Sequence, residues 1–528
     1  MKCPRCRHTP PSSAKFCPEC GQALTGQAAA TAVAPAPTPA HLAEKILSAR
    51  GAIEGERKLV TVLFADLRGS LELLVDRDPE EARSLLDPVI ERMTEAVHRY
   101  EGTVNQVLGD GIMAIFGAPL AHEDHALRAC YAAVRMQEAV RAYAAELRRR
   151  QGVPVQIRVG LNSGEVVVGA IGNDFQVEYR AVGPSTHLAA RMEQIAQPGT
   201  TLLTMSTFRL VEGLVEVKPL GPVPVKGLAE PLEVFELTGI GPTRSRLHAS
   251  ASRGLAPFVG REGERGVIDE QLAATAAGRG AAVALVGEAG VGKSRLVREC
   301  LEALRHAGWL VLEGAAVSYG QGTPFYPVIE VLRAYFGVDR RDDAARVRDR
   351  ITARVLALDP ALATSTPALF ALLDVADADA SWEAIDPPER RQRTLEALRR
   401  VCVRESRVQP LLVVLEDLQW VDSETHALLS HLLDGVPSVR AGMLLTYRPD
   451  FHERWAGHPN CREIVLGPLG RESTDALLDA LLGEATELAP LKRCSASARA
   501  AIRSLSRRAC AVSSSSACWR DRRARTAS

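Results

Sequence analysis

Four cysteines near the N-terminus have the spacing of a metal site. Cys3, Cys6, Cys17 and Cys20 form the pattern C-x2-C-x10-C-x2-C. Two such pairs can direct four thiolates at one ion, and a closed tetrahedron of thiolates is typical of structural Zn²⁺. The segment is too short to fold on an apolar core, so zinc would supply its folding energy. A redox-active or metal-free arm is the alternative interpretation.

Two aspartates lie at the ends of predicted strands in the first half of the chain. The β-branched, apolar run over residues 59–64 predicts a strand that ends in Ala65 and Asp66. Asp110 lies in the Gly-Asp-Gly turn of a predicted hairpin over residues 102–116. Two carboxylates at adjacent strand ends suit Mg²⁺ or Mn²⁺, and two such ions can activate a hydroxyl and support a leaving phosphate. Taken alone, each aspartate is better explained as a turn residue.

A glycine-rich loop in the second half has the pattern G-x-x-x-x-G-K-S. It lies between a predicted strand over residues 283–286 and a predicted helix over residues 295–307, which is the context that phosphate binding requires. Glycine amides wrap the β-phosphate, the lysine reaches the β- and γ-phosphates, and the serine ligates Mg²⁺. The residues in these roles are Gly287, Gly292, Lys293 and Ser294. The loop therefore predicts a site for ATP with Mg²⁺.

A second buried strand, predicted over residues 411–415, ends in Glu416 and Asp417. Adjacent acids in this place are typical of a Walker B motif, in which one carboxylate holds the Mg²⁺ shell and the other orients a water. The sequence does not assign the two roles. Arg448 follows another apolar strand, over residues 443–445, and is explained either as a sensor of the γ-phosphate or as a solvated arginine at a strand end.

Alternating strand-like and helix-like segments position these residues in two large blocks. With 528 residues, of which 46% are hydrophobic and 24% charged, the chain is typical of a globular protein with several domains. We therefore expect a multidomain α/β fold, with a parallel sheet around the glycine-rich loop. The N-terminal segment resembles a zinc ribbon. The predicted boundaries are 1–24 for the ribbon, 25–56 for a linker and short helix, 57–238 for the first block, 239–256 for a connector, 257–493 for the P-loop block and 494–528 for a disordered tail.

The charge balance excludes some classes of function. Lys+Arg and Asp+Glu number 64 each, so no chain-wide positive field for nucleic acid or anionic membrane is expected. No apolar run reaches the length of a membrane span, and the N-terminus does not read as a signal peptide. We expect a cytoplasmic protein with no membrane and no nucleic-acid partner. Residues 494–528 hold eight arginines and one acid, so residues 1–493 carry seven more acidic than basic residues.

Four stretches of the first block resemble the class III nucleotidyl cyclase domain. They are VTVLFADLRGS, GTVNQVLGDGIMAIFG, IRVGLNSGEVVVGAIG and YRAVGPSTHLAARME. The resemblance implies a ferredoxin-like βαββαβ domain that dimerises head to tail, with active sites at the interface of a homodimer. It also implies that Asp66 and Asp110 hold the metal ions, that ATP is converted to cyclic AMP and pyrophosphate, and that Arg191 stabilises the transition state.

The same resemblance has three departures. Gln106 stands where the family has a purine-selecting lysine, Arg180 stands at its Asp or Thr partner, and His187 replaces a transition-state asparagine. A guanidinium only donates hydrogen bonds, so Arg180 cannot accept one from the adenine amino group. The two predicted metal ligands, Asp66 and Asp110, match the family, whereas the residues at the base-selecting positions do not. The alternative to an active adenylate cyclase is therefore an impaired cyclase fold that dimerises or binds nucleotide without turnover.

The second block resembles a STAND-type or AAA-like signalling ATPase, through FVGRE, the P-loop, EDLQWVD and TYRP. The order of the blocks resembles multidomain bacterial adenylate cyclases related to soluble adenylate cyclase, which implies that ATP binding regulates the cyclase. That family continues with a lid that this chain lacks, and residues 494–528 interrupt the pattern. We interpret them as a frameshifted end of a truncated chain; a genuine basic tail is the alternative. Apart from a second copy of the chain, the sequence does not identify a protein partner.

Overall fold

The computed structural model describes residues 56–69, 78–152, 154–171, 178–182, 184–225, 230–241, 257–339, 342–375, 380–452 and 455–482. The predicted zinc ribbon with its four cysteines, nearly all of the linker and the Arg-rich tail lie outside these residues, so they stay predictions. The chain divides into two compact units, Met1–Arg253 and Gly254–Ser528. None of the helices in the described parts of the chain is long and apolar enough to cross a membrane.

The first unit is built around one mixed sheet. The strands follow the order β2-β3-β1-β4-β6-β8-β7, with β5 paired to β4. Its first six elements are βαββαβ, as the sequence predicts. The elements are β1 (Glu56–Leu67), α3 (Pro79–Arg99), β2 (Thr103–Val107), β3 (Gly111–Phe116), α4 (His125–Gln151), β4 (Ile157–Ile171), β5 (Glu178–Val182), α5 (Pro184–Ile195), β6 (Thr201–Thr204), α6 (Met205–Val211), β7 (Val215–Val223) and β8 (Leu232–Ile240).

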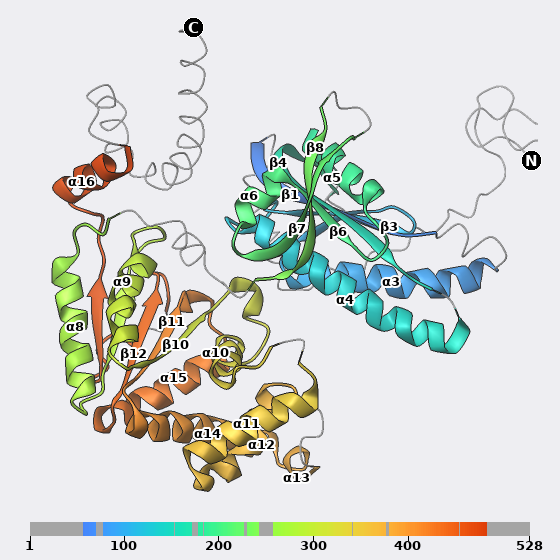
Figure 1. Cartoon of the computed structure of the whole chain (residues 1–528). Coiled ribbons are helices and arrows are strands. Elements are labelled where there is room, and N and C mark those ends of the chain that lie inside the picture. Colours follow the sequence, from blue (N-terminus) through green and yellow to red (C-terminus); the bar gives the residue numbers. More distant parts are fainter. Residues whose placement is uncertain are drawn as a thin grey trace, which may run out of the picture. The chain divides into compact units, whose positions relative to one another are not determined.

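Alternation along β1 assigns the two faces of this sheet. Leu63 and Ala65 pack with buried side chains of α3 and α4 on one face of the sheet. Figure 1 shows these two helices beside the sheet. Val60 and Val62 point to the other face, where Ala189 of α5 packs. Asp66 and Val62 are an even number of residues apart, so the side chain of Asp66 lies on the α5 face. The residues on that face therefore surround the carboxylate.

β1 is longer than the sequence predicts. It begins at Glu56, before the predicted strand, and ends at Leu67, directly after Asp66, because β4 pairs with it over this whole length and β3 pairs with it up to Asp66. Asp66 is therefore fixed by strand pairing and does not lie in a turn. The predicted hairpin is confirmed: β2 and β3 are joined through Gly109, whose φ of 77° is in the left-handed region, and Leu108 N donates to Gly111 O at 2.8 Å.

The second unit contains a parallel sheet with the strand order β10-β11-β12-β9-β13, which confirms the predicted parallel sheet. Its elements are α8 (Glu262–Ala276), β9 (Ala282–Val286), α9 (Lys293–His306), β10 (Leu310–Ala315), α10 (Tyr326–Phe336), α11 (Ala344–Leu358), α12 (Thr366–Leu372), α13 (Ala380–Glu383), α14 (Pro387–Val408), β11 (Leu411–Glu416), α15 (Ser423–Gly435), β12 (Ala441–Tyr447), β13 (Cys461–Val465) and α16 (Arg471–Leu482).

Helices cover both faces of the parallel sheet (Figure 1). Side chains of α8 and α9 pack with Val283 and Leu285 of β9 on one face. Side chains of α10 and α15 pack with Ala284 and Val286 on the other. Because both faces are covered, β9 is apolar and buried throughout, as expected for a central parallel strand.

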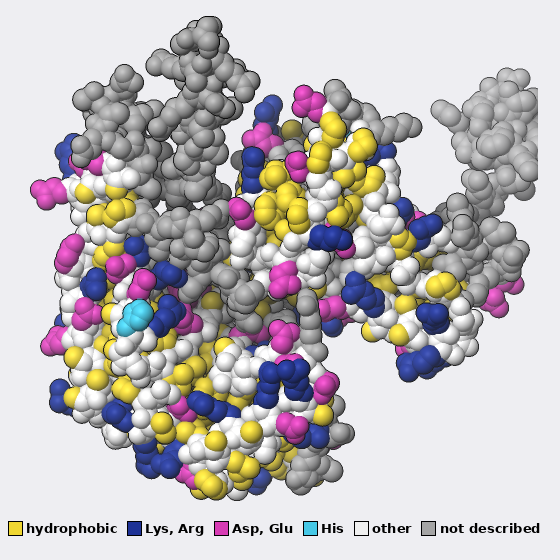
Figure 2. Space-filling view, in the orientation of Figure 1, with side chains coloured by type: hydrophobic (Ala, Val, Ile, Leu, Met, Phe, Trp, Pro, Cys, Tyr) yellow, Lys and Arg dark blue, Asp and Glu magenta, His cyan; other side chains and the backbone are white. Residues whose placement is uncertain are grey.

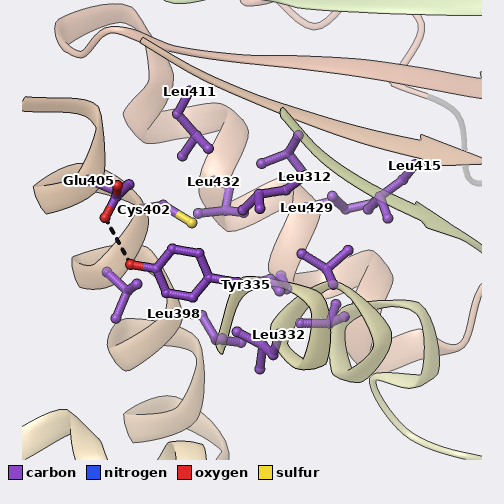
Figure 3. Close-up of a pocket in the computed structure, with 15 residues that line it drawn as sticks. Leu312, Leu332, Tyr335, Leu398, Cys402, Glu405, Leu411, Leu415, Leu429 and Leu432 are labelled. Atoms are coloured by element: carbon purple, nitrogen blue, oxygen red, sulfur yellow. Dashed lines mark hydrogen bonds between the residues drawn. The ribbon is translucent and has the colours of Figure 1, made fainter. Parts of the chain in front are cut away.

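An apolar cavity of about 60 Å³ lies where α10, α14 and α15 meet β10 and β11 (Figure 3). Its lining is mostly leucine and valine, and Cys402 of α14 projects into the same group of side chains (Figure 3). At one end the Tyr335 hydroxyl donates to Glu405 Oε2 at 2.8 Å. The cavity is large enough for water, but its apolar lining offers water few partners. It is therefore a packing defect in this half of the unit.

Candidate functional site

The structure brings Asp66 and Asp110 together at one edge of the first unit. Asp66 pairs in register with Gly111, directly after Asp110 in the hairpin turn. Leu67 N donates to Asp110 O at 3.2 Å, which ties the turn to β1. A Cβ on Gly111 would lie 2.5 Å from Ala65 O, so only glycine lets the turn come this close.

The electrostatics of Asp66 reflect this crowding. Burial raises the pKa of Asp66, the hydrogen bond from Arg158 lowers it, and the neighbouring Asp110 raises it by charge and by a hydrogen bond. Two carboxylates in such proximity are a donor set that fits a divalent cation. Among the described residues no group of three or more His, Cys, Asp or Glu forms a metal site. The candidate is therefore a two-carboxylate site.

Arg158 and Glu193 belong to this site, although the sequence interpretation missed them. Arg158 lies directly opposite Asp66 on β4, and its Nη2 donates to Asp66 Oδ2 at 2.8 Å. Glu193 of α5 has its Oε1 at 2.8 Å from the same Nη2. Burial raises the pKa of Glu193 to about 7, Arg158 lowers it, and Asp66 and Asp110 raise it. Side chains alternate between the two faces along β4, and Arg158 lies on the same face of the sheet as Asp66. That alternation was the sequence signal that could have identified Arg158.

A glycine explains how α5 reaches the strand. Gly160 of β4 pairs with Phe64, and a Cβ there would lie 2.2 Å from Glu193 N and 2.3 Å from Ala189 O. Both obstacles are backbone atoms, which cannot move aside as a side chain can. Gly160 thus allows the contact between α5 and β4 that puts Glu193 beside Arg158.

The other predicted cyclase residues lie on α5, β2 and β5. Arg191 is on α5 and donates to Gln194 Oε1 at 2.5 Å, and His187 is exposed on the same helix. Gln106 is exposed on β2, where the pairing with β3 shifts register. Arg180 lies in β5, opposite Gly169. Asp66 and Asp110 are therefore adjacent within one chain, and Gln106 and Arg180 lie on strands that contact each other.

A buried ion pair supports the start of the hairpin. Glu101 precedes β2 with a φ of 57°, and its Oε2 accepts from Arg128 Nη1 at 2.7 Å. Both side chains are almost fully buried, and Arg128 also donates to Asp124 at 2.7 Å. The pair joins the turn after α3 to the first turns of α4. It fixes the chain just before the strand that leads to Asp110.

The predicted P-loop of the second unit connects β9 to α9. α9 begins at Lys293, directly after Gly292, whose φ of 104° is available only to glycine at low cost. Gly287 is also required, because a Cβ would lie 2.8 Å from Val291 Cγ1. Ser294 follows as the second residue of the helix. The local geometry is that of a phosphate-binding loop at a helix N-terminus.

Lys293 lies within this loop and faces the predicted Walker B acids. Its Nζ donates to Gly287 O at 2.7 Å and to Glu288 O at 3.2 Å. Burial lowers the pKa of Lys293; Asp417 raises it, Arg448 lowers it, and Glu416 raises it. The structure therefore brings together the lysine, both acids and the arginine that the sequence singled out from distant segments.

Asp417 is held in a strained conformation. Its φ is 58°, which is unusual for a residue with a side chain, and its N–H donates to Thr446 Oγ1 of β12 at 3.0 Å. The guanidinium of Arg448 lies 5.8 Å from the ring centre of Trp420, just beyond Asp417. Strain of this kind is common at functional sites, which agrees with a role for Asp417 near the nucleotide.

Together, a carboxylate pair on a mixed sheet and a P-loop on a parallel sheet define an α/β protein with two sites suited to phosphate chemistry. Residues 54–239 match the family model of the adenylate and guanylate cyclase catalytic domain. Residues 257–445 match the family model of the AAA ATPase domain. The chain therefore contains a class III cyclase domain followed by an AAA ATPase domain.

Relatives of known sequence resemble this chain in part. An uncharacterised protein of Rhizobium meliloti is 26% identical over 423 residues, which covers 80% of this chain and 40% of the relative. Adenylate cyclase 1 of the same organism is 30% identical over 187 residues, which covers 35% of this chain and 28% of the relative. The chain thus spans less than half the length of either relative.

Solved structures similar to the chain include two cyclases. The adenylyl cyclase CyaB of P. aeruginosa is 28% identical, covering 36% of this chain and 98% of that structure, with a TM-score of 0.34. The guanylyl cyclase Cya2 is 31% identical, covering 37% of this chain and 98% of that structure, with a TM-score of 0.35.

Proposed function

We propose that the first unit is a nucleotidyl cyclase that converts ATP to cyclic AMP and pyrophosphate with a divalent cation. The observation that carries this proposal is the pair Asp66 and Asp110, which lie within hydrogen-bonding reach of each other. Two ionised carboxylates this close repel each other, and a divalent cation removes the repulsion. Mg²⁺ or Mn²⁺ suits this all-oxygen donor set. Similarity to an adenylate cyclase of R. meliloti adds support.

In the proposed reaction the 3′-oxygen of ATP bonds to its α-phosphorus, the bond from that phosphorus to the oxygen of pyrophosphate breaks, and the hydroxyl proton passes to solvent water. When bound, the cation would activate the hydroxyl and neutralise phosphate charge. Asp66 and Asp110 would hold the cation, and Arg158 would keep positive charge beside them. Arg191 and His187 would donate to phosphoryl oxygens as charge develops.

We expect a second copy of the chain to complete the site. The resemblance to class III cyclases supports a homodimer, and so do large hydrophobic side chains exposed on the first unit: Leu59, Leu108, Val167 and Leu220. Figure 2 shows hydrophobic side chains gathered on the visible face of this unit. Exposed apolar patches of this kind are typical of interaction surfaces.

GTP is the second candidate substrate, and Arg180 is the residue that favours it. An arginine matches the acceptors O6 and N7 of guanine, whereas adenine presents an amino donor next to N7. Gln106 can both donate and accept, so it is compatible with either base. The substrate test must therefore include both nucleotides.

A cyclase fold without turnover is the alternative function, and the departures at Gln106, Arg180 and His187 favour it. In that case the P-loop unit would carry the activity of the chain as an ATP-dependent switch. In either case we propose that Lys293, Ser294 and the acids Glu416 and Asp417 bind ATP with Mg²⁺ in the second unit.

The test uses the full chain, as wild type and as Lys293→Ala, incubated with ATP or GTP and with Mg²⁺ or Mn²⁺. Chromatography and mass spectrometry identify any cyclic nucleotide. Product that Asp66→Asn abolishes, and that Asp87→Asn on the surface of α3 leaves unchanged, supports the cyclase. If no combination of nucleotide and metal ion gives a cyclic nucleotide at high protein concentration, the alternative function is favoured, in which the cyclase fold has no turnover and the chain is an ATP-dependent switch.

A further inference from the structure

One guanidinium serves two carboxylates beside the proposed cation site. Arg158 Nη2 is 2.8 Å from Asp66 Oδ2 and also 2.8 Å from Glu193 Oε1. The three side chains are largely buried, with exposed fractions of 22% for Arg158, 29% for Asp66 and 10% for Glu193. The surroundings therefore screen these charges less than water would.

Only one of the two contacts is a good hydrogen bond. The contact to Asp66 has hydrogen-bond geometry, whereas that to Glu193 is an ion pair without it. Glu193 Oε1 and Arg158 Nε are buried atoms that have no hydrogen-bond partner among the described residues. Buried polar atoms normally have partners, so these two mark an arrangement that is incomplete in this state. A small rotation of the guanidinium could pair them with each other.

The charges at this edge are unequal. Asp66, Asp110 and Glu193 contribute three carboxylates, and Arg158 is the cation that acts on both Asp66 and Glu193. A divalent cation at Asp66 and Asp110 would repel Arg158 and compete with it for Asp66. Glu193 is the acceptor already in contact with the displaced guanidinium.

We propose that Arg158 is an internal counter-ion that competes with the divalent cation for Asp66, and that Glu193 receives Arg158 when the cation binds. This inference rests on the proposed cation site at Asp66 and Asp110. Glu193 then acts as a positioning residue, because it affects the cation through Arg158. The exchange keeps the guanidinium beside the cation and away from solvent.

The proposal predicts that replacing Arg158 and replacing Glu193 change the affinity for the cation in opposite directions. Arg158→Gln removes the competitor, so Mn²⁺ should bind about tenfold more tightly. Glu193→Gln removes one of the two carboxylates that contact Arg158 and leaves Asp66. Arg158 then stays with Asp66, so Mn²⁺ should bind about tenfold more weakly. In the double variant the Glu193→Gln change should alter affinity less than about twofold, because the residue it acts through is gone.

The experiment measures free Mn²⁺ by electron paramagnetic resonance during titration of the full, nucleotide-free chain. Asp66→Asn identifies the site. Arg158→Lys, which keeps the charge, should stay close to wild type and guards against misfolding of Arg158→Gln. Arg135→Gln, which breaks a surface ion pair on α4, is the matched control and should change nothing.

Two results separate failure of this inference from failure of the proposed function. If Asp66→Asn removes no Mn²⁺ binding, the cation site itself is wrong and the inference falls with it. If binding depends on Asp66 but Arg158→Gln does not strengthen it, the exchange is refuted while the cation site stands. A full tenfold loss on adding Glu193→Gln to Arg158→Gln also refutes the exchange, since Glu193 would then act directly.

Discussion

Filling the apolar cavity of the second unit should stabilise that unit. Cys402 lines the cavity of about 60 Å³, and methionine at this position would add two carbon atoms to a side chain that already points into it (Figure 3). At ~24 cal/mol per Å³, the cavity costs about 1.4 kcal/mol. Burying two more carbon groups contributes about 1.6 kcal/mol. Ordering methionine costs about 1.5 kcal/mol, so the net gain is about 1 to 2 kcal/mol.

The matched control is Cys300→Met. Like Cys402, Cys300 is a cysteine on a helix, but it is buried in α9 within the close-packed cluster against β9. The same two carbon atoms have no space there, so overpacking should cost about 1 to 3 kcal/mol. Because both changes replace a helical cysteine with methionine, differences in helix propensity cancel. The two variants should therefore shift stability in opposite directions.

The assay is thermal unfolding of the full chain, with the transition of the second unit identified by its rise on addition of ATP and Mg²⁺. For a unit of this size, 1 kcal/mol corresponds to about 2 to 4 °C, so Cys402→Met should raise the midpoint by about 2 to 8 °C. A lower midpoint for Cys402→Met, comparable to that of Cys300→Met, would refute the reasoning, since the space would then be closed to a side chain.

Three further predictions test the framework around the two sites. Glu101→Gln should destabilise the first unit by about 3 kcal/mol in urea unfolding, because it leaves the buried Arg128 without one partner; a change under about 1 kcal/mol contradicts this. Gly160→Ala should unfold or strongly weaken the same unit, because its Cβ would lie 2.2 Å from a backbone nitrogen of α5, whereas Gly266→Ala in α8 has free space and should stabilise by about 1 kcal/mol. Lys293→Ala should abolish the rise in the second unit's midpoint that ATP causes; at a hundredfold excess over Kd this rise corresponds to a stabilisation of about 2.7 kcal/mol, and an undiminished rise would show that ATP binds elsewhere.

Most of the fold could be predicted because local patterns and pairing agree. The hairpin around Asp110 has glycines where the turn needs them, and the strand before the P-loop is continuously apolar because both of its faces are covered. The predicted start of β1 was too late by a few residues, because strand length depends on neighbouring strands. β4 extends the pairing back to Glu56, and no local pattern encodes that partner.

The site was predictable where a motif is contiguous and not where it is assembled across the sheet. Lys293 and its glycines are adjacent in sequence, so the loop was found directly. Arg158 and Glu193 are far from Asp66 in sequence, and they meet it through strand register and the close approach of α5 at Gly160. A glycine reveals such an approach only once the packing partner is known.

The charge cluster itself bears on whether the first unit is a cyclase or only a dimerisation domain. Burial raises the pKa of Glu193 to about 7 and also raises that of Asp66, so both carboxylates are less favourable when ionised in the folded chain than in water. A raised carboxyl pKa adds stability at low pH that is lost as pH rises through the folded value, so near neutrality the cluster is a cost. A dimerisation domain has no need of that cost, whereas a site that binds a divalent cation recovers it on binding. The cluster therefore favours the cation-dependent function over the alternative, even though the residues at the base-selecting positions depart from the family pattern.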